Sequence, residues 1–134
     1  MGIDEYNSYE KIVDIYDNCV FYPYVPAPLH LEVTSYAKFG ILFYRPTILN
    51  KAFCAPNKIF EYGGFGIPMI GNDIPGLKNT IGNSNAGICT KLTEENILNA
   101  LNTMEKDYEF YSKNALDYFN SVDNYKTMKD FLKK

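Results

Sequence analysis

The sequence predicts an α/β fold, namely a Rossmann-like parallel sheet flanked by helices. Short apolar runs without polar alternation recur along the chain, as in strands that are buried on both faces. Between them lie segments with apolar residues at helical spacing, and strands that alternate with helices form parallel sheets. With 134 residues, 46% of them hydrophobic, the chain is long enough for one such core, so we expect residues 1–134 to form a single domain.

The elements expected in the first third of the chain are helix, strand, helix and strand. Residues 3–16 carry apolar side chains at helical spacing, and the apolar run 19–25 follows as a strand. Two prolines end that strand. Residues 30–39 can form a second helix, and residues 41–44 a second strand.

The middle of the chain begins with a loop over residues 45–55. A short helix then opens on Pro56 and ends at Gly66, which is suited to a left-handed cap. Residues 67–71 form another buried strand, and Pro75 and Gly76 suit the central positions of a type II turn. Residues 77–81 can form one or two helical turns.

The last third contains an edge strand and three helices. The strand covers residues 86–92, and Thr93 then caps an amphipathic helix whose first turn holds Glu94 and Glu95. Two more helices follow, over residues 107–121 and 125–133.

The helix after Pro56 holds the most informative residues. Lys58 places a cation in the first turn, where the helix dipole disfavours it by about 0.3 to 1 kcal/mol, which suggests a bound anion. Glu61, on the same side of the helix as Asn57, could accept hydrogen bonds from hydroxyl groups attached to that anion. The alternative is an ordinary surface ion pair between Lys58 and Glu61.

The position of this helix favours the anion site. Ligands of open α/β sheets bind beyond the carboxyl ends of the strands, where the loops 24–28, 44–57 and 72–77 are expected to emerge. The helix begins at that rim. A phosphate that carries a sugar fits both Lys58 and Glu61.

Charge and cysteine content exclude other classes of protein. The net charge of −3 provides no basic excess for a nucleic-acid or anionic-membrane surface. Three widely spaced cysteines indicate neither a disulfide framework nor a metal knuckle, so we expect a protein of the reducing cytoplasm. The longest apolar run, residues 39–44, is too short to cross a bilayer.

The ordered motifs resemble a known family. The series is Pro56-Asn57-Lys58-x-x-Glu61-Tyr62, a glycine-proline entry into a strand, Asp-x-Pro-Gly at 73–76, a Gly-Ile strand and a helix opening on Thr-Glu-Glu at 93–95. It resembles the donor-binding C-terminal domain of GT-B glycosyltransferases, in particular the glycosyl transferases group 1, or family 4, superfamily. The likeness runs from about residue 18 to the C-terminus.

The resemblance implies a nucleotide diphosphate sugar as substrate, a UDP or GDP sugar, with no cofactor and no metal. It assigns the ribose hydroxyls to Glu61 and the diphosphate to Pro56, Asn57 and Lys58. It gives no catalytic residue.

The resemblance also assigns the remaining parts of the donor. Tyr24, Val25 and Pro26 would lie against the base, and Gly76 and Leu77 would approach the donor sugar and phosphates through their backbone.

Two departures from the family concern the site. Many members carry a second glutamate eight positions before the ribose-binding one, where this chain has Phe53. Many also neutralise the diphosphate with an arginine and a lysine from an earlier segment, which this chain lacks, and Arg45 could substitute.

The third departure is length. We expect the chain to be part of a longer two-domain enzyme, inactive alone, with the missing N-terminal domain supplying the acceptor site and any peripheral membrane contact. The C-terminal helix, residues 125–134, would pack on that domain, self-associate through an exposed apolar stripe, or pack on this domain's own sheet.

Two other functions stay open. One is a non-catalytic α/β interaction module, such as a receiver-like domain with Asp73 near a strand end, although the expected acidic pair after the first strand is absent. The other keeps the GT-B fold but changes the chemistry, as in nucleotide-sugar epimerases and phosphorylases.

Overall fold

The computed structural model describes residues 8–16 and 18–133. The chain divides into two compact units, Met1–Thr34 and Ser35–Lys134, and each is described by itself.

The first unit contains helix α1 and the start of helix α2. Helix α1, Ser8–Val13, lies within the predicted helix 3–16, of which residues 3–7 fall outside the described part. The ring of Tyr9 packs on that of Phe21, with centroids 5.3 Å apart. Helix α2, His30–Ser35, ends four residues earlier than predicted, and the segment after it contacts other elements through Lys38 and Phe39 instead.

The predicted strand over residues 19–25 is wrong. These residues pair with no strand, and several of their apolar side chains are exposed, Val20 to 80% and Tyr24 to 64%. An apolar run becomes a strand only when a neighbour takes up its backbone hydrogen bonds, and no such neighbour is found among the described residues.

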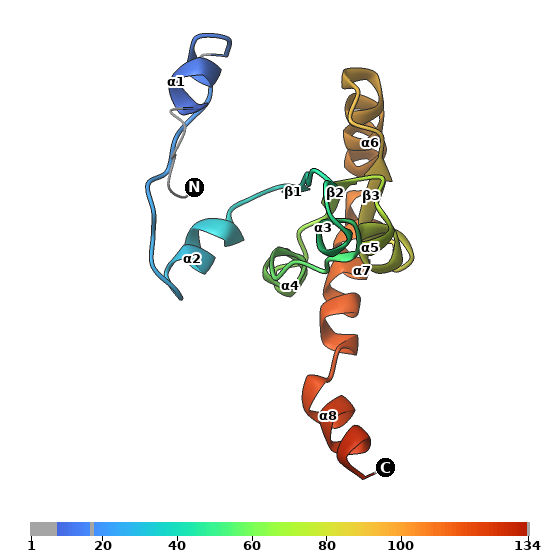
Figure 1. Ribbon diagram of the computed structural model, residues 1–134. Coiled ribbons are helices and arrows are strands. Elements are labelled where there is room, and N and C mark those ends of the chain that lie inside the picture. The colour runs from blue at the N-terminus through green and yellow to red at the C-terminus, as the bar shows by residue number, and fades with distance from the viewer. Residues whose placement is uncertain (1–7, 17, 134) are drawn as a thin grey trace. The chain divides into compact units, whose positions relative to one another are not determined.

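The second unit is built on a parallel sheet, which confirms the predicted α/β fold. Among the described residues the sheet has three strands in the order β1-β2-β3: Gly40–Leu42, Met69–Asn72 and Gly87–Thr90. Both pairings are parallel, with Ile70 of β2 opposite Ile41 and Ile88. Figure 1 shows the three strands side by side.

Helices cover both faces of the central strand β2, as the apolar runs predicted. Met69 joins a buried cluster that includes Ile59 and Leu77, while its neighbour Ile70 joins a second cluster with Ala100 and Met104. Successive side chains of a strand point to opposite faces, so each face of β2 has a core of its own.

Apart from α3, which lies in a predicted loop, the helices of the second unit follow the predicted order. They are α3 (Leu49–Phe53), α4 (Lys58–Gly64), α5 (Pro75–Leu77), the π-helical turn η1 (Lys78–Gly82), α6 (Glu94–Lys106), α7 (Tyr108–Ser121) and α8 (Asn124–Leu132). Helix α6 begins as expected, because the side chain of Thr93 accepts a hydrogen bond from the backbone N–H of Asn96.

Helix α4 ends in the predicted left-handed cap. Gly66 has a φ of +63°, its N–H donates to the carbonyl of Gly63, and the N–H of Ile67 donates to the carbonyl of Tyr62. These two bonds form a Schellman motif, in which a glycine satisfies the last carbonyls of a helix.

Two predictions in the middle of the chain are wrong. The supposed loop 45–55 contains α3, a five-residue helix too short to show a periodic pattern. The supposed type II turn is the start of α5, and Gly76 does not have the positive φ that such a turn requires. Gly76 is needed for space, because a Cβ there would lie 2.3 Å from the carbonyl oxygen of Cys54.

Candidate functional site

The carboxyl ends of β1 and β2 are joined by one buried amide. Asn72, 6% exposed, accepts a 2.8 Å hydrogen bond from the N–H of Tyr44 and donates a 2.9 Å bond to its carbonyl. The side chain thus continues the sheet by one residue pair. The sequence analysis missed this role, and its only signal was a polar residue at the end of an apolar strand.

Helix α4 begins at this edge, two residues later than predicted. It starts at Lys58 with Asn57 as N-cap, and the carbonyl of Pro56 accepts from the N–H of Ile59 in the preceding turn. The backbone N–H groups of Asn57 and Lys58 have no acceptor among the described residues. Together with the Lys58 ammonium they form a group of donors suited to an anion.

The side chains of Lys58 and Glu61 form an ion pair with each other. The Lys58 Nζ and a Glu61 carboxylate oxygen lie 3.2 Å apart, with the side chains 47% and 21% exposed. Exposed ion pairs contribute about 0 to 1 kcal/mol, so Lys58, the more exposed of the two groups, could exchange Glu61 for a ligand atom at little cost. The pairing is the alternative raised by the sequence, and it is compatible with a ligand site.

Two tyrosine side chains, Tyr44 and Tyr62, lie near Glu61. Burial raises the pKa of Tyr44, and so do the neighbouring Cys54, Tyr62 and Glu61. Burial also raises the pKa of Tyr62, which Lys58 lowers and Glu61 raises. The Lys58 ammonium lies 5.9 Å from the centre of the Tyr62 ring. Both phenols stay neutral at physiological pH and can act as hydrogen-bond donors.

The start of α5 packs against the chain just before α4. The missing side chain of Gly76 leaves room for the backbone of Phe53 and Cys54, and Cys54 lies three residues before Asn57. The N–H groups of Gly76 and Leu77 have no acceptor among the described residues. The Leu77 side chain is fully buried, so only its backbone could reach a ligand.

The other predicted site residues lie around this edge or in the first unit. Arg45 follows Tyr44 directly and is exposed. Tyr24 and Pro26 are exposed and Val25 is half-buried, and all three belong to the first unit. Phe53, at the position of the family's second glutamate, is 61% exposed at the end of α3.

Asp73, two residues before α5, belongs to a separate ion pair. Asp73 forms a 2.5 Å ion pair with Lys78, and this bond raises the pKa of Lys78. Burial, with a further contribution from Asp73, raises the pKa of the Cys89 thiol to about 11. Asp73 therefore already has a cationic partner from the turn that follows it.

Comparisons with protein-family models, with curated proteins and with solved structures find no match to this chain. In the described part of the chain, no three His, Cys, Asp or Glu side chains gather in a group that could hold a metal ion. Within the same residues, no helix has both the length and the apolar character needed to cross a membrane.

Proposed function

We propose that this chain binds a nucleotide diphosphate sugar, a UDP or GDP sugar, as the donor domain of a cytoplasmic GT-B glycosyltransferase that transfers a hexose. The observation that carries the proposal is the meeting of two helix starts at the carboxyl edge of a parallel sheet. Among the described residues, neither the amides of Asn57 and Lys58 at one start nor those of Gly76 and Leu77 at the other have an acceptor. The contact of Gly76 with Cys54 brings the two starts together.

The proposed roles follow from the chemistry of the donor. The amides and the Lys58 ammonium would hold the diphosphate and neutralise the charge that develops on it as the glycosidic bond breaks. Arg45 would add a second cation. Glu61, released from Lys58, would accept hydrogen bonds from the ribose hydroxyls. A further domain would supply the acceptor and any general base.

Nuclear magnetic resonance titrations with pyrophosphate, UDP and GDP test these roles separately. Lys58→Ala should weaken the binding of all three ligands by about tenfold or more, since hydrogen bonds to charged groups contribute about 1.5 to 3 kcal/mol. Glu61→Gln should weaken the binding of UDP and GDP, which carry ribose hydroxyls. Pyrophosphate should bind equally well or more tightly, because the substitution releases Lys58 from its ion pair.

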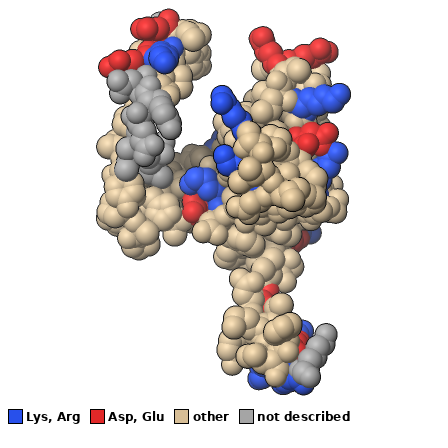
Figure 2. Space-filling view, viewed as in Figure 1, with Lys and Arg blue, Asp and Glu red and all other residues tan. Residues whose placement is uncertain are grey.

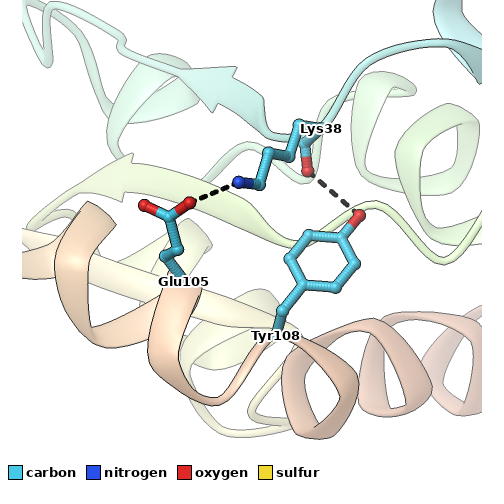
Figure 3. Close-up of polar contacts among 3 residues, drawn as sticks. All are labelled: Lys38, Glu105 and Tyr108. Carbon is cyan, nitrogen blue, oxygen red and sulfur yellow. Dashed lines mark hydrogen bonds and ion pairs between the residues drawn. The ribbon is translucent and has the colours of Figure 1, made fainter.

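The chain offers a matched control in a second exposed ion pair. The Lys38 Nζ and a Glu105 carboxylate oxygen lie 2.5 Å apart, and each side chain is 59% exposed. The Tyr108 hydroxyl donates a hydrogen bond to the Lys38 carbonyl (Figure 3). Lys38→Ala and Glu105→Gln remove the same charges away from α4 and should leave all titrations unchanged. If none of the three ligands shifts resonances of α4 or α5 at millimolar concentration, the proposal fails.

The same sample tests the receiver-like alternative. A receiver-like module would accept a phosphoryl group on Asp73 from acetyl phosphate. Because Asp73 is already paired with Lys78, we expect no phosphorylation. An epimerase of the same fold would show the same binding of UDP and GDP, so the sequence encoded upstream of this chain would have to distinguish it.

A further inference from the structure

Helix α8 exposes a continuous apolar stripe. Tyr125, Met128, Phe131 and Leu132 are 78%, 66%, 75% and 76% exposed, and α8 contributes no buried residue. Their spacing of three and four places them on one side of the helix. This is the exposed stripe that the sequence allowed, and the alternative of packing on the sheet is wrong.

Lysines border this stripe on one side. A shallow groove of about 340 Å³ lies on the surface of α8 and is lined by Lys129 and Lys133 together with Tyr125, Met128 and Leu132. The aliphatic part of a lysine can cover apolar surface while its ammonium reaches water or a negative group.

The charge of α8 differs from that of the chain. With its two cap residues, 123–133, the helix holds Lys126, Lys129 and Lys133 against Asp123 and Asp130, a net charge of +1, whereas the whole chain has a net charge of −3. Asp130 lies two residues from both Met128 and Leu132, which places it on the opposite side of the helix from the stripe. Figure 2 shows tan surface over α8, with blue basic atoms and fewer red acidic atoms towards its end.

We infer that α8 binds an anionic lipid surface, with its apolar stripe entering the interface and its lysines contacting the lipid headgroups. Four features agree with such a helix: low overall hydrophobicity, an apolar face with phenylalanine and leucine, a tyrosine at its edge, and flanking lysines. The net charge of the whole chain argued against an anionic surface, but the local excess on α8 reverses that argument for this helix.

The charge also argues against a second copy as the occupant. Two copies that met antiparallel through the stripe would bring the lysines that border it close to those of the other copy. Like charges at an interface disfavour association, and no carboxylate is found among the described residues that line the groove.

Vesicle sedimentation with the full chain tests this inference. At low salt, vesicles of phosphatidylcholine with about 30% phosphatidylserine should bind the chain, and vesicles of phosphatidylcholine alone should bind it at least about tenfold less. Binding to the anionic vesicles should weaken as salt is added.

Paired variants separate the two contributions. Lys129→Ser with Lys133→Ser should lower binding to the anionic vesicles by about tenfold or more, since each lysine near such a surface contributes about fivefold. Met128→Ser with Leu132→Ser should abolish binding. Lys106→Ser with Lys113→Ser makes the same charge change on α6 and α7, and binding should stay within about twofold of the unchanged chain.

The inference is overturned by any of three results. One is the absence of binding to anionic vesicles when the circular dichroism spectrum shows a folded chain. Another is equal binding by the Lys129/Lys133 variant and the control. The third is a concentration-dependent dimer, seen by analytical ultracentrifugation, that Met128→Ser with Leu132→Ser dissolves while vesicles bind neither protein.

Discussion

Replacement of Asn72 tests whether one amide holds the edge of the sheet on which the site is built. The side chain makes two hydrogen bonds to the backbone of Tyr44, at 2.8 and 2.9 Å, and is 6% exposed. Each bond contributes about 0.5 to 1.5 kcal/mol. The two bonds together contribute about 1 to 3 kcal/mol. Because Tyr44 is only half-buried, water can partly replace them, and Asn72→Ala should cost about 1 to 2 kcal/mol.

Urea unfolding followed by circular dichroism measures this loss, and hydrogen exchange locates it. The amide of Tyr44 should be protected in the unchanged chain and should exchange faster in Asn72→Ala. Asn102→Ala is the control, because Asn102 is exposed on α6 and alanine favours a helix. The reasoning is refuted if the free energy of unfolding of Asn72→Ala lies within about 0.5 kcal/mol of that of the unchanged chain, which is the range of ordinary surface substitutions.

Asn72→Asp adds a pH dependence of known sign. Its carboxylate can still accept from the Tyr44 N–H, but its second oxygen would face the Tyr44 carbonyl, so the protonated form is favoured and the folded-state pKa is raised above about 3.9. The stabilisation is therefore present at low pH and lost as the pH rises through the folded-state pKa. The stability deficit of this variant should shrink between about pH 7 and pH 4, and a constant deficit would contradict the geometry.

Three further predictions concern the same unit. Gly76→Ala should cost about 2 kcal/mol or more in urea unfolding, because its Cβ would meet backbone atoms at 2.3 to 2.9 Å. At Gly82 an added Cβ would lie 3.7 Å from its nearest neighbour, the Cys89 Sγ, so Gly82→Ala should leave the free energy of unfolding unchanged or raise it slightly. The pKa of Cys89 is about 11 in the folded chain, against 9.0 for a free thiol, so folding favours the neutral thiol. Its contribution to the stability of the folded chain is therefore present below pH 9 and is lost as the pH rises towards 11. At pH 8, iodoacetamide should alkylate Cys89 at least about tenfold more slowly in the folded chain than in urea, as peptide mass spectrometry can measure. Thr93→Ala should cost about 1 kcal/mol through the lost N-cap, whereas Thr103→Ala within α6 should cost nothing.

Local signals predicted those elements whose stability is local. Helix α6 has a capping threonine, two acidic residues in its first turn and an apolar face, and it begins where these residues place it. The end of α4 depends on one glycine with a positive φ, which residue type alone can indicate.

Pairing partners and close approaches leave no such signal. Residues 19–25 have the composition of a buried strand, but whether they form one depends on a neighbour that composition does not specify. Helix α3 has only five residues and no side-chain cap, so neither periodicity nor capping indicates it. Gly76 suited a turn by residue type, whereas its structural role is to admit the backbone of a distant segment.

The two contacts missed by the sequence analysis explain how the site could be held in place. The segment from β2 to α5 contacts the chain before α4 twice, through Asn72 at Tyr44 and through Gly76 at Cys54. Residues 44–54, which include α3, are therefore fixed at both ends. Since α4 begins four residues after Cys54, the position of Lys58 depends on the same two contacts. A substitution at Asn72 that leaves the chain folded should thus weaken pyrophosphate binding although the Asn72 side chain is not among the groups proposed to contact the ligand, whereas Gly82→Ala should not.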